Sequence, residues 1–122
     1  MRKVVKFEIL TVGNELLLGR TLNTNAHYLS SRVTDLGGLA TRSTTVMDDV
    51  EEIASAIQQG LDRRVDWILV CGGLGPTYDD RTLEGVAKAL RRPLALDHQA
   101  LRWMKERYHT LARKGLMKKV EL

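Results

Sequence analysis

The order of secondary-structure patterns in this 122-residue chain predicts an α/β fold, a mainly parallel sheet with helices on both faces. Three stretches of strand character, residues 4–12, 39–46 and 66–71, each precede an amphipathic helical pattern. Such alternation is typical of parallel strands joined by right-handed crossovers. Residues 9–12 are also almost continuously apolar, as expected for a strand that is buried on both faces.

The first strand is rich in β-branched and aromatic side chains and closes at Gly13. Residues 14–22 are too apolar for a free loop and too interrupted by glycine for a long helix. Glu15 stands just past the strand, where ligand-binding residues gather in open parallel sheets. It is either a site residue or a surface carboxylate, and we give the two interpretations equal weight.

The first helical pattern begins at residues 23–25, which offer several N-cap side chains, and Gly37 ends it. Asn25 can either cap this helix or donate a hydrogen bond to a ligand. His27 has no partner at metal-ligand spacing, so we interpret it as a surface residue. The apolar positions on one face of the helix are Ala26, Leu29, Val33 and Leu36.

The second strand, residues 39–46, is polar enough to predict a position near the edge of the sheet. Asp48 follows it and stands three residues before Glu51, the spacing of a capping box. The alternative is that Asp48 joins Asp80 in holding a divalent cation or in orienting phosphates. Spacing alone favours the cap.

The third strand runs into a glycine loop that precedes a helical pattern at residue 83. Glycines at 72, 73 and 75 let the backbone approach a ligand closely, and bare amides before a helix attract anions. The loop fits neither the Walker A nor the dinucleotide pattern. Thr77 and Thr82 can donate to phosphate oxygens, whereas Asp79 and Asp80 imply a bridging cation or an N-cap. A tight turn with an aspartate cap is the equally weighted alternative.

A fourth helical pattern starts at Asp97, and Gly115 is suited to end it. Residues 116–122 could begin another strand or form a frayed end. We expect the stripe of apolar residues on this helix to belong to the core: Leu101, Met104, Tyr108, Leu111 and Ala112.

The composition limits the classes of function. A net charge of +4 suits phosphorylated ligands but is too diffuse to favour nucleic acid. Cys71 is the single cysteine, which excludes an internal disulfide and agrees with a reducing compartment. The sequence shows neither a signal-peptide pattern nor an apolar run of membrane-spanning length, so we expect a cytoplasmic protein without membrane association.

Three separated stretches converge if the sheet is parallel: Gly13 to Glu15, Asp48 and the loop from Gly72 to Thr82. All three follow strands, and ligands of open α/β sheets bind beyond the carboxyl ends of the strands. The sequence therefore predicts a site for a phosphorylated ligand at this edge.

These residues also carry a resemblance. The segments 11–25, 46–49 and 72–82, with Thr-Val-Gly-Asn-Glu-Leu-Leu-Leu-Gly-Arg, Val-Met-Asp-Asp and Gly-Gly-Leu-Gly-Pro-Thr-Tyr-Asp-Asp-Arg-Thr, resemble the molybdopterin-binding domain family, which includes MoaB and MogA. Within that family, the sequence is most similar to the N-terminal domain of competence/damage-inducible CinA proteins. The likeness extends over about residues 7 to 114.

The resemblance implies a three-layer α/β/α fold, a site for a pterin phosphate or nucleotide, and a homo-oligomer. It places the two functional aspartates, expected to be catalytic and to bind a divalent cation such as Mg²⁺, at Asp48 and Asp80. The remaining residues expected to bind the ligand are Gly13, Glu15, Asn25, Gly72, Gly73, Leu74, Gly75, Pro76, Thr77 and Thr82.

Family domains continue into further strands with a Pro-Glu-Gly turn and an Asn-Pro-x-Gly-Thr-x-Pro-Gly loop, and the sequence contains neither motif. We therefore expect residues 1–122 to form a single molybdopterin-binding-like domain that lacks those C-terminal strands and that loop.

Three functions follow from the resemblance. An enzyme would act on a pyrophosphate linkage, as CinA-like domains do on ADP-ribose or molybdopterin adenylyltransferases do in molybdenum cofactor biosynthesis. A binding module would hold the pterin or nucleotide unchanged. An interaction domain would have an empty site.

Overall fold

A computed structural model describes residues 3–115 of the chain, and in it three strands form one parallel sheet. The strand order is β2 (Leu39–Val46), β1 (Lys6–Val12), β3 (Trp67–Cys71). The apolar run lies in the central strand, where residues 8–12 are all buried, and the polar second strand lies at an edge. Both expectations from the sequence are confirmed, and the strand order places a crevice beyond the ends of β1 and β3.

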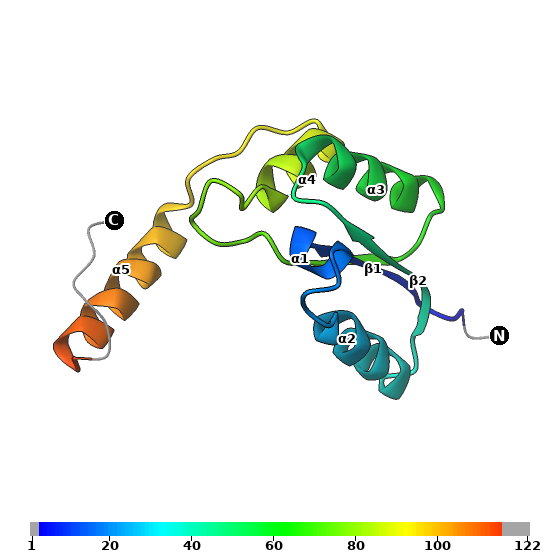
Figure 1. Cartoon of the computed structure of the whole chain (residues 1–122), viewed down its shortest axis with the longest axis horizontal. Coiled ribbons are helices and arrows are strands. Elements are labelled where there is room, and N and C mark those ends of the chain that lie inside the picture. The colour runs from blue at the N-terminus through cyan, green and yellow to red at the C-terminus, as the bar shows by residue number, and fades with distance from the viewer. Residues whose placement is uncertain (1–2, 116–122) are drawn as a thin grey trace.

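Helices cover both faces of the sheet, which confirms the predicted α/β/α layering (Figure 1). The helix α2 (Thr24–Asp35) packs on one face against β1 and β2. On the other face lie α3 (Val50–Asp62) and α4 (Thr82–Leu90), which pack closely on each other. The short α1 (Asn14–Leu17) is a single turn directly after β1.

The main core lies between the sheet and α3. Leu10, Val12 and Val46 of the strands contact Ile53 and Ile57 of α3, and all five are buried. These contacts fix α3 against the two strands whose carboxyl ends form the predicted site.

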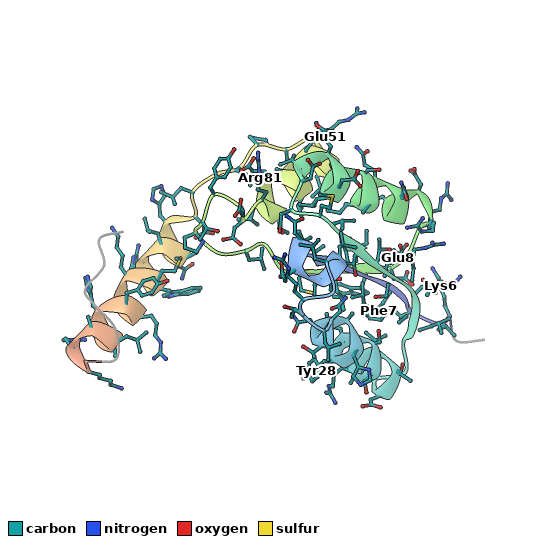
Figure 2. All side chains as sticks on the ribbon, viewed as in Figure 1. Lys6, Phe7, Glu8, Tyr28, Glu51 and Arg81 are labelled. Carbon is teal, nitrogen blue, oxygen red and sulfur yellow. The ribbon has the colours of Figure 1, made fainter. Side chains whose placement is uncertain are left out.

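A buried ion pair joins β1 to the end of α3. Phe7 and Glu8 point to opposite faces of β1, Phe7 toward α2 and Glu8 toward α3 (Figure 2). Glu8 is 5% exposed, and its carboxylate accepts from Arg63 Nε at 2.9 Å and Nη2 at 2.6 Å. Arg42 Nε of β2 lies 3.9 Å from the same carboxylate. A bidentate guanidinium therefore compensates a charge that burial alone would destabilise.

Two expectations about apolar faces are wrong. Leu36 is 78% exposed, because it lies beyond the last turn of α2, at its C-cap. The apolar stripe of α5 (His98–Arg113) is not part of the core, because α5 stands apart from the sheet (Figure 1) and none of its residues is buried. The Asp97 cap is confirmed, since its carboxylate accepts from the Ala100 N–H. Residues 116–122 lie outside the described part of the chain.

The cap of α3 is also a correction. Asp49, not Asp48, is the N-cap, and its Oδ1 accepts from the Glu52 N–H at 3.0 Å. Neighbouring aspartates each stand three residues before a glutamate, so the spacing is equally good for both. The extended backbone of Asp49 decides which side chain reaches the helix.

Across residues 3–115, no helix combines the length and the apolar character that crossing a bilayer requires.

We predict that Arg63→Met lowers the free energy of unfolding, because the buried Glu8 carboxylate loses its bidentate partner and keeps only the more distant Arg42. Urea unfolding measures this change. Arg64→Met is the matched control, since no ion pair between described residues involves Arg64. Equal stabilities of the two variants would contradict the role given to the Glu8–Arg63 pair.

Candidate functional site

A cavity of about 520 Å³ opens at the carboxyl ends of the strands. This volume lies in the range of small-molecule sites, roughly 300–1,000 Å³. The lining residues come from the end of β1 and α1, from the β2–α3 connection and from the glycine loop: Val12, Asn14, Glu15, Leu18, Arg20, Asp48, Gly72, Gly73, Asp79 and Asp80.

Reciprocal hydrogen bonds tie the ends of β1 and β2 together. The Asn14 N–H donates to Asp48 Oδ2 at 3.1 Å, and the Asp48 N–H donates to Asn14 Oδ1 at 3.0 Å. The Gly13 N–H adds a bond to the Val46 carbonyl at 3.0 Å. Asp48 therefore does not cap a helix, and Asn14, a neutral residue at the start of α1, orients its carboxylate.

Gly72 and Gly73 let the loop pass across the end of β1. Gly72 has φ +90°, and a β-carbon there would overlap the Val12 carbonyl oxygen. A β-carbon at Gly73 would overlap the Thr82 hydroxyl oxygen. Thr82 is buried, and its hydroxyl donates to the Gly72 carbonyl at 2.6 Å. The Thr82 side chain therefore holds the loop against the start of α4.

Asp80 stabilises the second part of the loop through hydrogen bonds with Thr77. Its Oδ2 accepts from the Thr77 hydroxyl at 2.6 Å and from the Thr77 N–H at 3.0 Å. The hydroxyl chiefly, and then the N–H, hold the pKa of the Asp80 carboxyl below its ordinary value. A β-carbon at Gly75 would lie 2.7 Å from the same oxygen, so a larger residue there would displace the Asp80 carboxylate. Asp80 does not cap α4, whose N-cap is Arg81.

A second cavity of about 130 Å³ adjoins the first and shares Val12, Glu15 and Gly72 with it. Asn25 lines this cavity, whereas the cap of α2 is Asn23, which accepts from the Ala26 N–H. Its remaining walls combine hydroxyl and amide side chains, those of Thr11, Thr21, Asn23 and Thr24, with the apolar side chains of Leu16 and Leu22.

Cys71 also lines the second cavity, and burial raises the pKa of its thiol. A raised pKa disfavours the nucleophilic thiolate. Cys71 is therefore a wall of the cavity rather than a reactive group.

The predicted residues divide into three groups. Glu15, Asp48, Gly72, Gly73 and Asp80 meet at the main cavity, and Asn25 lines the second. Gly13, Leu74, Gly75, Pro76, Thr77 and Thr82 line neither cavity, although Thr77 and Thr82 shape the loop.

Sequence reasoning did not select Asn14 or Arg20, which also line the main cavity. Asn14 could have been found from its place directly after the first strand. Arg20 lies five residues beyond Glu15, across a glycine turn, and its position depends on how that turn folds.

The carboxylates fit one kind of cation site. Within residues 3–115, no group of three or more His, Cys, Asp or Glu side chains is arranged to hold a metal ion. Mg²⁺, however, is commonly held by one or two carboxylates together with substrate phosphates and waters. Asp48 and Asp80 line one cavity, so they are the residues that could hold a cation shared with a phosphorylated ligand.

A family model described as a probable molybdopterin binding domain matches residues 8–120. A protein of Metallosphaera sedula is 54% identical over 103 residues, which are 84% of this chain and 39% of that protein. A protein of Pyrococcus abyssi is 48% identical over 118 residues, which are 97% of this chain and 47% of that protein. The chain thus spans less than half the length of these curated relatives.

Solved structures give the same picture. The CinA protein from Thermoplasma acidophilum, whose function is described as unknown, matches with a TM-score of 0.82 and 42% identity, covering 87% of this chain and 62% of that one. The tungsten cofactor synthesizing protein MoaB from Pyrococcus furiosus matches with a TM-score of 0.66 over 95% of this chain and 67% of that one. At 19% identity, the second likeness shows the fold alone.

We predict that Thr77→Val raises the pKa of the Asp80 carboxyl toward the ordinary aspartate value of about 3.9, because the Thr77 hydroxyl, the donor that lowers this pKa most, is lost. Carboxyl-detected NMR titration measures this pKa. Thr34→Val is the control, since the Thr34 hydroxyl donates to the Ser30 carbonyl on α2.

The stability of the loop therefore depends on pH through Asp80. A lowered pKa in the folded loop means that Asp80 stabilises the loop fully above the unfolded pKa, about 3.9, and loses that contribution as the pH falls through the folded value. Identical Asp80 titration in wild type and Thr77→Val would contradict this account of the loop.

Proposed function

Because this chain belongs to the family of probable molybdopterin binding domains, of the type found at the N-terminus of CinA proteins, we propose that its cavity binds a phosphorylated pterin or nucleotide. The convergence of three chain segments on one cavity is the observation that carries the proposal. These segments supply acidic side chains, the cationic side chain of Arg20 and glycine backbone that a ligand can approach closely.

The two adjoining cavities suit the two parts of such a ligand. The larger one contains the charged side chains and accommodates the phosphates with a shared cation. The smaller one has hydroxyl and amide groups beside apolar side chains, which suit the hydrogen-bonding edge and the flat faces of an uncharged heterocycle. Glu15 lines both cavities and stands where the two parts of the ligand would join.

The same site would suit hydrolysis of a pyrophosphate linkage, in which water adds to one phosphorus and the other phosphate group leaves, and ADP-ribose is the substrate to test first. Asp48 and Asp80 would hold the cation, and a cation there supplies neutralisation of the charge that develops on phosphate oxygens. Asn14 keeps the Asp48 carboxylate in place, and Thr77 does the same for Asp80. Gly72 and Gly73 leave room for the phosphates at the cavity wall.

We predict that Asp48→Asn and Asp80→Asn each reduce Mg²⁺-dependent cleavage of ADP-ribose by about 10²–10³, the usual effect of removing one charge-stabilising group. Chromatography of the products measures the rate. Asp35→Asn is the matched control, because its carboxylate lies on α2, 4.0 Å from Arg32 and outside both cavities.

Calorimetry with molybdopterin, AMP and ADP-ribose, with and without Mg²⁺, separates binding from turnover. Saturable binding that leaves every ligand intact would reduce the proposal to a binding module. Absence of saturable binding by all three ligands would contradict the proposal and would favour an interaction domain.

A further inference from the structure

Arg20 is held at the main cavity by a turn whose backbone is fixed. Gly19 has φ +71°, and the N–H groups of Arg20 and Thr21 both donate to the Glu15 carbonyl, at 3.0 and 3.3 Å. The turn therefore returns the chain to the end of α1, where the Arg20 side chain lines the cavity beside the acids.

The charges around this cavity are unequal. Its lining contains four carboxylates, those of Glu15, Asp48, Asp79 and Asp80, and Arg20 is the one cationic side chain among the described residues that line it. A phosphorylated ligand would be repelled by four acids unless positive charge compensated its own. One compensating positive charge can be a metal cation that binds together with the ligand. The other is the Arg20 guanidinium of the protein itself.

The Arg20 guanidinium is also available for a ligand, in contrast to those of Arg63 and Arg81. Arg63 is paired with Glu8 and Arg81 with Glu84. Within the described part of the chain, residues 3–115, no ion pair involves Arg20, although four carboxylates line the same cavity. The guanidinium thus lines an acidic cavity without pairing to any of its acids.

We propose that Arg20 is a ligand-binding residue whose guanidinium binds phosphate oxygens and makes the cavity selective for phosphorylated over unphosphorylated forms of the same ligand. This inference rests on the proposed function and adds the group that recognises the phosphate. A planar guanidinium donates two parallel N–H bonds to a phosphate, which a lysine cannot reproduce. The acids hold the shared cation, and Arg20 contacts the oxygens that the cation leaves open.

The test compares AMP with adenosine as calorimetric probes in the presence of Mg²⁺. We expect wild type to bind AMP more tightly than adenosine, and Arg20→Gln to weaken AMP binding about 10- to 100-fold, the typical effect of losing a hydrogen bond to a charged group. Adenosine binding stays unchanged in this variant. The AMP affinity of Arg20→Lys lies between those of wild type and Arg20→Gln, because lysine keeps the positive charge but lacks the two parallel N–H donors of the guanidinium.

Arg32→Gln is the matched control, since it removes the same charge from the last turn of α2, outside both cavities. Its affinity for AMP equals that of wild type. A thermal unfolding midpoint of Arg20→Gln close to that of wild type confirms that the variant is folded, as expected for an exposed side chain.

Each contrary outcome has a distinct meaning. Equal AMP affinities of wild type and Arg20→Gln would overturn the role of Arg20 and leave the proposed function standing. Equal losses for AMP and adenosine would also overturn it, because they would indicate a structural effect. Failure of wild type to bind AMP, ADP-ribose and molybdopterin would overturn the proposed function and this inference together.

Discussion

The close passage of Gly72 over the end of β1 is the constraint on which the site depends. A β-carbon at this position would overlap the Val12 carbonyl oxygen, and the backbone adopts φ +90°. L-amino acids with side chains rarely adopt such a conformation. Thr82 then fixes the crossing by donating its hydroxyl to the Gly72 carbonyl and its N–H to the Gly73 carbonyl. The start of α4 and the end of β1 are thereby brought to the same cavity.

Neutral donors orient two of the acids at that cavity. Asn14 and Asp48 exchange side-chain and backbone hydrogen bonds between neighbouring connections, and Thr77 donates twice to Asp80. None of these donors carries a charge, so the negative charge of the carboxylates is not cancelled within the protein. A cavity built this way retains its attraction for a cation, and a phosphate that shares the cation can then be accommodated.

The sequence predicts the layers and the convergence well because both follow from local patterns. An apolar run identifies β1 as the central strand, a polar run identifies β2 as an edge, and strand ends in a parallel sheet must meet. Periodicity does not reveal whether a neighbour covers a helix, so it wrongly predicts a core position for the apolar stripe of α5, none of whose residues is buried. The choice between Asp48 and Asp49 as cap depends on one backbone conformation. The position of Arg20 depends on the glycine turn before it.

Replacement of Mg²⁺ by paramagnetic Mn²⁺ in the presence of AMP tests most directly whether these segments form one site. The account predicts that NMR signals from the backbone amides of Asn14, Asp48, Gly73 and Asp80 broaden together, because all four residues line the cavity. Signals from the last turn of α2, at Arg32 and Asp35, stay sharp. Broadening that is confined to one of the segments, or that centres on α2, would contradict a shared cation and phosphate site at the ends of the strands.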